Sequence, residues 1–145
     1  MSEMVQEVQD APAPTRRKWW TATSWDKIAS GESEIGRSGA SEDEPDRRFW
    51  LFGIGEPGTE GMPTVIRAFF PAGTREEVHT HACDYCEIIL EGTQQVTGKW
   101  YGPGDVRVAK GGTSYGPLIA GPEGVLKLVI FADDRVARIF PGDQS

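Results

Sequence analysis

The sequence predicts a single all-β domain, folded as a sandwich or a barrel. Among its 145 residues are 18 glycines and 10 prolines, and they divide most of the chain into short apolar runs. Regularly spaced short strands separated by such turn residues are typical of β sandwiches and barrels. The length suffices for one domain with a sizeable core but not for two. We expect no helix of more than two turns.

The N-terminal third carries the segments with the weakest strand pattern. Residues 1–17, which include Ala11-Pro12-Ala13-Pro14, are expected to form a disordered leader. The domain would then span residues 18–145, and Lys18–Thr23 would be its first strand, with tryptophans covering apolar surface. Residues 30–46 are rich in Gly, Ser and Glu, which predicts a long polar loop that could act as a lid.

From Arg48 onward, almost every apolar run has the length of a strand. Glycine, proline or a polar pair follows each run at short intervals, as strand-to-strand connections require. The strands predicted in this region are Phe49–Gly53, Pro63–Phe70, Tyr85–Leu90, Gln94–Tyr101, Val106–Ala109, Val125–Phe131 and Val136–Phe140.

The chain has only two histidines, and they alternate as His79-Thr80-His81. In an extended strand, residues i and i+2 share one face, so both imidazoles should project in the same direction. Two ligands of one metal ion need this arrangement. Two solvated histidines on a strand are the alternative, and the surrounding sequence decides between the two interpretations.

That surrounding sequence resembles the two motifs of the cupin superfamily. The first motif is matched by Gly73, five further residues, His79-Thr80-His81 and the closing Gly92. The second is matched by Gly104-Asp105, the strand Val106–Ala109, Lys110-Gly111-Gly112 and the position of Tyr115. Together the motifs cover about a third of the chain. The resemblance implies a single-domain cupin double-stranded β-helix, or jelly-roll barrel, and a homodimer.

The ligand positions of this chain depart from the cupin pattern. Tyr85 occupies the position of the metal-binding Glu, and Tyr115 that of the third metal-binding His. Glu87 lies two residues after Tyr85, so on a regular strand it shares the inward face. A bulge after His81 would exchange the inward and outward faces of the strand and turn Cys86 inward instead. The spacing to Gly92 favours a regular strand without the bulge.

The resemblance and the spacing together predict a site for one divalent metal ion. His79, His81 and Glu87 are the expected ligands, and Tyr115, Tyr85 and Glu87 are the expected catalytic groups. Two imidazoles and a carboxylate form the ligand set of non-haem iron oxygenases, so Fe²⁺ is expected first, although Zn²⁺, Mn²⁺, Ni²⁺ and Co²⁺ accept the same donors. Neighbouring aromatic side chains would suit a ring-bearing or apolar substrate; the candidates are Trp50, Phe52, Phe69 and Trp100.

The two cysteines form the pattern Cys83-x-x-Cys86. Such a pair can be a redox dithiol or half of a zinc site, but the chain has no second pair to complete a four-sulfur site. Two unpaired thiols in and after a turn are the favoured interpretation, and they suit a reducing cytoplasm. Cys83 follows His81 closely enough to approach a metal from the side.

Composition excludes some classes of partner. The net charge of −7 and the pI near 4.8 argue against nucleic acid, because phosphate binding needs a basic surface. No apolar run has the length of a membrane helix, and the acidic N-terminus is unlike a secretory signal. The expected partner is a small organic substrate, and the expected location is the cytoplasm.

Three functions compete at the level of sequence. The first is a metal-dependent dioxygenase, the oxidoreductase activity that the cupin resemblance implies most often for small members. The second is a metal-dependent lyase, isomerase or cyclase. It is favoured by the Tyr and Glu at ligand positions, which resemble the mixtures in cupin lyases acting on dimethylsulfoniopropionate and in ectoine synthase. The third is a non-catalytic cupin that only binds a small molecule. We place the two enzyme hypotheses above the third because both histidines and a carboxylate remain, and of these two the sequence slightly favours the dioxygenase.

Overall fold

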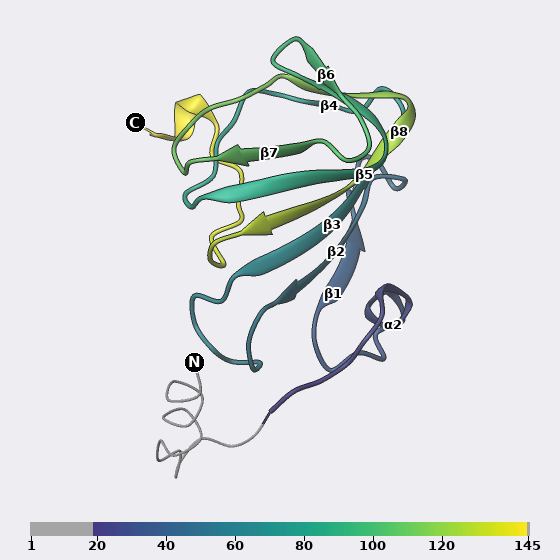
Figure 1. The fold of residues 1–145 in the computed structure, drawn as a ribbon, viewed down its shortest axis with the longest axis vertical. Helices are drawn as coiled ribbons and strands as arrows, with labels where there is room; N and C mark the ends of the chain where they lie inside the picture. Colours follow the sequence, from purple (N-terminus) through teal and green to yellow (C-terminus); the bar gives the residue numbers. More distant parts are fainter. Residues whose placement is uncertain (1–18, 145) are drawn as a thin grey trace, which may run out of the picture.

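Antiparallel strands make up most of the computed structural model, which describes residues 19–144 (Figure 1). The eight strands are β1 (Arg37–Ala40), β2 (Arg48–Gly53), β3 (Thr64–Phe70), β4 (Arg75–Glu76), β5 (Tyr85–Val96), β6 (Lys99–Tyr101), β7 (Val106–Ala109) and β8 (Leu118–Phe131). Helical structure is limited to α2 (Trp25–Ser30) and the 3₁₀ turn η1 (Pro141–Gln144) within the described range. The all-β prediction is confirmed.

Strands β5 and β8 are long enough to take part in two layers. The first half of β5 and the second half of β8 belong to a layer in the order β1-β2-β3-β8-β5-β7. The remaining halves pair with each other and with β6 and β4. Figure 1 shows the first layer as a fan of strands, with β4 and β6 at the top of the molecule. β5 therefore joins residues from two predicted strands, and β8 extends the predicted strand Val125–Phe131 back to Leu118.

Glycines allow β5 and β8 to cross closely where they bend. The register of β5 against β8 shifts between Ile89 and Glu91 and again between Gly92 and Gln94. Gly92 has a φ of 74°, and a Cβ atom there would collide with the carbonyl oxygen of Gly124 on β8. The closing glycine of the first motif thus has a packing role, because only glycine combines this conformation with so close a backbone approach.

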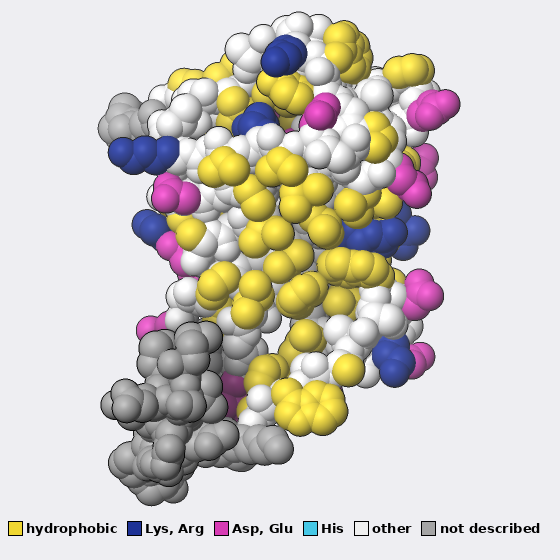
Figure 2. Space-filling model, in the orientation of Figure 1, with side chains coloured by type: hydrophobic (Ala, Val, Ile, Leu, Met, Phe, Trp, Pro, Cys, Tyr) yellow, Lys and Arg dark blue, Asp and Glu magenta, His cyan; other side chains and the backbone are white. Residues whose placement is uncertain are grey.

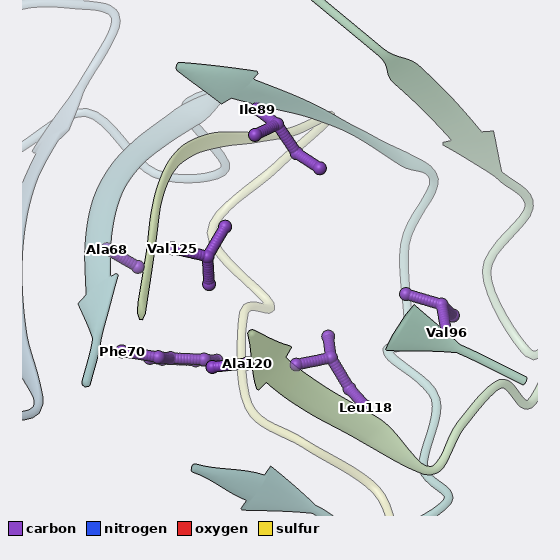
Figure 3. Close-up of a cluster of buried hydrophobic side chains, with 7 residues drawn as sticks. All are labelled: Ala68, Phe70, Ile89, Val96, Leu118, Ala120 and Val125. Atoms are coloured by element: carbon purple, nitrogen blue, oxygen red, sulfur yellow. The ribbon is translucent and has the colours of Figure 1, made fainter. Parts of the chain in front are cut away.

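The main apolar core lies between the two layers. Seven buried side chains from β3, β5 and β8 point toward one another (Figure 3), namely Ala68, Phe70, Ile89, Val96, Leu118, Ala120 and Val125. A smaller cluster of Cys83, Tyr85 and Phe131 lies nearer the histidines. Tyr85, Glu87 and Ile89 are all buried while Cys86 and Ile88 are partly exposed, so β5 has the predicted regular frame at this end.

Two segments differ from their predicted structure, and a third prediction is not tested. Residues 19–23 of the predicted first strand are not in a strand and lead into α2, where the Ser24 hydroxyl caps the helix by accepting from the amide of Lys27. The predicted loop 30–46 is not continuous, because β1 lies within it and pairs with β2. The predicted leader, residues 1–17, lies outside the described residues.

The predicted strand Val136–Phe140 is also wrong. Only Ile139 makes a bridge, with Thr80. The carbonyl oxygens of Val136 and Ala137 instead accept from the ring of His81, so this segment supports a side chain rather than a neighbouring strand. The predicted strand Gln94–Tyr101 is interrupted by a turn at Thr97 and Gly98, which both have positive φ.

No helix in the described part of the chain is long and apolar enough to cross a membrane.

Candidate functional site

Two backbone bridges place the histidines side by side. His79 pairs with Tyr115 through two hydrogen bonds of 3.0 Å, and Thr80 pairs with Ile139. The extended backbone between them directs both imidazoles to the same side, as predicted, with ring centroids 5.2 Å apart. His79 is 1% exposed and His81 is 6% exposed. The sequence spacing therefore produces a pair of buried imidazoles.

Backbone carbonyls fix the protonation pattern of both rings. The Nδ1 atom of His79 lies 2.7 Å from the carbonyl oxygen of Glu77, and that of His81 lies 3.1 Å from those of Val136 and Ala137. A carbonyl only accepts, so Nδ1 carries the hydrogen and Nε2 keeps its lone pair. Burial lowers the pKa of both histidines below the usual 6.5, which keeps the rings neutral at neutral pH.

The hydroxyl of Tyr115 lies where the two Nε2 atoms converge. It is 2.7 Å from Nε2 of His79 and 3.4 Å from Nε2 of His81. Since His79 Nε2 has no hydrogen, the hydroxyl donates to it. Burial holds the pKa of Tyr115 far above its ordinary value of 10, so the phenol is neutral. The position that the second motif predicts for the third ligand is thus occupied by an oxygen facing both histidines.

Glu87 points inward as predicted but is held by other side chains. Its carboxylate lies 3.1 Å from Nζ of Lys127, accepts a short hydrogen bond from Gln94 and lies 3.4 Å from Nη2 of Arg107. Burial alone would raise the pKa of Glu87, but the charges of Lys127 and Arg107 outweigh it and lower that pKa. Glu87 lines the same cavity as the histidines, yet it is the anion of a buried ion network.

Arg107 links this network to the tyrosines. Its guanidinium lies 4.3 Å from the ring centroid of Tyr115, and its Nη1 donates to the Tyr85 hydroxyl at 3.3 Å. Tyr85 itself packs edge-on against His81, with centroids 5.0 Å apart. The ring of Tyr85 thus lies beside the imidazole pair, while its hydroxyl accepts a hydrogen bond from Arg107.

A second carboxylate, which the motif comparison did not identify, lies beside His79. Oε2 of Glu76 is 3.5 Å from Nε2 of His79. Its other oxygen, Oε1, contacts Arg47 and lies 3.0 Å from Nη1 of Arg138. The only sequence signal was its position three residues before His79. Arg47 lies 32 residues before His79 and Arg138 lies 57 residues after His81, so no local pattern connects them to this site.

One cavity of about 580 Å³ is lined by both histidines, Tyr115 and the two carboxylates. Its volume lies within the size range of small-molecule sites. Its apolar wall includes Phe49, Leu51, Ile66, Val129, Phe131 and Phe140. The aromatic side chains proposed from the sequence, Trp50, Phe52, Phe69 and Trp100, are not among its lining residues. Side chains alternate along a strand, and the neighbours Phe49 and Phe70 are the ones that line the cavity.

The cysteines are both free. Cys83 is 4% exposed, and its thiol donates to the carbonyl of Arg135 at 3.7 Å, while burial raises the pKa of that thiol. It therefore lies in the small apolar cluster as a neutral group. Cys86 is partly exposed on β5.

The donors that face the cavity fit a divalent metal ion in part. Two neutral imidazoles with unprotonated Nε2 atoms and a phenol oxygen converge, which is a donor set that Zn²⁺, Fe²⁺ and related ions accept. The backbone carbonyls that hold the Nδ1 atoms are the orienting partners that metal-binding histidines usually have. Among residues 19–144, no three His, Cys, Asp or Glu side chains lie close enough together to hold a metal by themselves.

Comparisons with known proteins identify the fold. No family model and no curated protein matches the sequence. Among solved structures, oxalate decarboxylase from Bacillus subtilis at pH 4.6 is similar with a TM-score of 0.55 and 17% identity, over 91% of this chain and 34% of that chain. A second structure of that enzyme, from a study of its Mn(II) centres, gives a TM-score of 0.59 and 16% identity, over 94% and 36%.

The polyketide cyclase RemF from Streptomyces resistomycificus is similar over a comparable length. The TM-score is 0.56 and the identity 13%, over 85% of this chain and 86% of that chain. This chain thus spans about a third of the oxalate decarboxylase chain but most of the cyclase chain. Together with the antiparallel topology, these similarities establish the predicted cupin jelly-roll fold.

Proposed function

We propose that this protein is a cupin enzyme that binds one divalent metal ion through Nε2 of His79 and His81 and acts on a small organic substrate by proton transfer. The observation that carries this proposal is the convergence of the two unprotonated Nε2 atoms and the Tyr115 hydroxyl in one cavity. A lyase, isomerase or cyclase needs such a combination of a charged centre and a nearby proton donor.

Each residue has a distinct part in this proposal. A metal ion bound here would act as a Lewis acid on a carbonyl or carboxylate oxygen of the substrate. The Tyr115 hydroxyl, kept neutral by burial, would donate a proton to the substrate atom that gains electron density. Arg107, stacked on the Tyr115 ring, would hold that ring in place. The apolar wall of the cavity would exclude water from the reacting atoms.

Dioxygenase chemistry is the second candidate, and Glu76 is the observation in its favour. Oxygenases of this type use two histidines and one carboxylate. Glu87, the carboxylate predicted from the sequence, is engaged by Lys127, whereas Oε2 of Glu76 lies 3.5 Å from Nε2 of His79. Proton-transfer chemistry ranks first because Tyr115 already faces both imidazoles.

Metal analysis of protein purified without added metal tests the proposal. Wild-type protein should contain about one divalent ion per chain, and the double variant His79→Ala/His81→Ala should contain almost none while keeping its β-sheet circular dichroism. Cys86→Ser, which alters a partly exposed side chain outside the cavity lining, should keep the metal. Equal metal content in the double variant and the wild type would refute the assigned ligands.

An oxygen-consumption assay then separates the two candidate activities. The metal-loaded protein is incubated with a panel of small organic acids, and dissolved oxygen and products are followed together. Product formation without oxygen uptake supports the proton-transfer enzyme. Uptake in proportion to product would assign the dioxygenase instead.

A further inference from the structure

The cavity is positively charged although the chain is acidic. The whole chain carries a net charge of −7. Its cavity, in contrast, is lined by five cationic side chains and two carboxylates, with the two histidines neutral; the cations are Arg37, Arg47, Arg48, Lys127 and Arg138. Charge of one sign concentrated in a cleft raises the local concentration of ligands of the opposite sign.

Part of the excess charge lies at Arg47 and Arg138, beside the histidines. Both guanidiniums contact one carboxylate, that of Glu76, and both through the same oxygen. Lys127 has its own counter-ion in Glu87, at 3.1 Å. Arg47 also has Glu44 at 3.9 Å, but that carboxylate is 45% exposed and contributes little. Burial, and after it the charge of Arg138, lowers the pKa of Arg47, as expected for two cations that one anion does not balance.

The position of this pair relates it to the reacting groups. Glu76 connects the two arginines to His79, because its Oε2 lies 3.5 Å from Nε2 of that ring. Arg47 lies over the ring of Phe70 at 4.4 Å, and Arg138 lies 5.8 Å from the ring centroid of Phe140. A ligand held by the arginines would therefore lie near both aromatic surface and the imidazole pair.

We infer that the substrate carries a carboxylate, which Arg47 and Arg138 bind, on an apolar or ring-bearing body that packs against Phe49 and Phe140. This inference rests on the proposed function, since it takes the cavity for the active site. Guanidinium groups bind carboxylates through paired, charge-assisted hydrogen bonds, which give both affinity and orientation. The substrate would thus be anchored beside the imidazoles, with its reactive part facing Tyr115.

Two probes of equal shape and different charge test the inference. Benzoate and benzamide differ by the negative charge, so calorimetric titration of the protein, purified without added metal, with each probe measures the preference for a carboxylate. We expect benzoate to bind at least about tenfold more tightly, because a hydrogen bond to a charged group is stronger than one to a neutral group. Arg138→Gln should remove most of that preference and leave benzamide binding unchanged.

The variant and its control are chosen to keep the fold intact. Arg138 is 46% exposed and Glu76 keeps Arg47 as a partner, so its replacement leaves no buried charge alone. Arg75→Gln makes the same change of charge at a side chain that is 52% exposed, pairs with Glu77 and does not line the cavity. This control should bind both probes as the wild type does.

The outcomes separate this inference from the proposed function. Equal affinities of the wild type for the two probes, equal behaviour of Arg138→Gln and the wild type, or binding of neither probe would each overturn the inference. Metal content is measured on the same samples. A protein that prefers benzoate but binds no metal would sustain the carboxylate subsite and refute the metal-dependent enzyme.

Discussion

The carboxylate of Glu87 and the ammonium of Lys127 lie 3.1 Å apart, and both residues are 3% exposed. Removing two charges from water is costly, and only their close contact and further hydrogen bonds compensate for it. Gln94 supplies these further hydrogen bonds, because its amide group donates to Glu87 and accepts from Lys127. Each member of this group therefore depends on the others, and such a group is sensitive to the loss of a single charge.

Glu87→Gln tests whether this carboxylate serves the ion network or a metal. The variant leaves Lys127 buried without its counter-ion, so we expect a loss of about 3–5 kcal/mol in the free energy of unfolding. Tyr85→Phe, which removes the hydroxyl that accepts from Arg107, should cost about 1 kcal/mol. Urea unfolding measures both values, and metal analysis accompanies them. Loss of metal in Glu87→Gln with little loss of stability would instead identify Glu87 as a ligand, which stays a prediction.

The sequence could predict the histidine pair and Tyr115 because motif spacing determines both. It could not predict that Glu76 lies at His79, since that contact depends on Arg47 and Arg138, which reach the cavity from distant segments. The sequence also could not show that the charge of the Glu87 carboxylate is balanced by a buried lysine. Lys127 lies in an apolar run that predicts a buried strand. Only the register that pairs Glu87 of β5 with Val129 of β8 brings the Lys127 ammonium close to the Glu87 carboxylate.

At the scale of elements, apolar runs predicted the positions of strands better than their ends. Val106–Ala109 is β7 without change, and Phe49–Gly53 differs from β2 by one residue. The predictions for β5 and β8 were too short, because these strands continue through polar and glycine-containing bends that usually end a strand. Figure 1 shows both passing from one layer toward the other. Closure of the sheet, rather than local propensity, keeps those residues extended.

The bend at Gly92 permits a matched test of close packing. Gly92 and Gly98 both have positive φ, 74° and 83°, but a Cβ atom on Gly98 would meet nothing within 4 Å. Gly98→Ala should therefore cost only the conformational strain, about 1–2 kcal/mol. Gly92→Ala adds the collision with Gly124, so it should lose at least about 1–3 kcal/mol more. Similar unfolding midpoints for the two variants would mean that β8 moves aside without cost.

For the molecule as a whole, the outer face of the first layer is unusually apolar. Strand register places two rows of side chains across it: Val108, Cys86, Ile130, Val65 and Phe52, then Val106, Ile88, Leu128, Arg67 and Trp50. Figure 2 shows hydrophobic side chains gathered over the middle of this face. Arg67 is the single charged member of the rows, and it stacks on Trp50 at 4.5 Å. Contiguous exposed apolar surface of this kind marks interaction sites.

We propose a second copy of the chain as the partner of this face. Two acidic molecules with a net charge of −7 repel each other, so copies associate best through surface without acidic groups, and neither row contains one. A sheet face can pack against its own copy about a two-fold axis, in the aligned manner of β sandwiches. The homodimer that the cupin resemblance implies stays a prediction, and this face is where we expect it to form.

Val108→Lys tests this association without disturbing the fold. Val108 is 77% exposed and its neighbour Val106 is 58% exposed, so a lysine at 108 removes little packing within one chain. In a dimer, however, two lysines would be buried against apolar surface at a cost of several kcal/mol each. Light scattering during size-exclusion chromatography should give a dimer for the wild type and a monomer for Val108→Lys. Thr113→Lys, an exposed loop position outside both rows, should remain dimeric. A monomeric wild type, or a dimeric Val108→Lys, would show that this face does not join two copies.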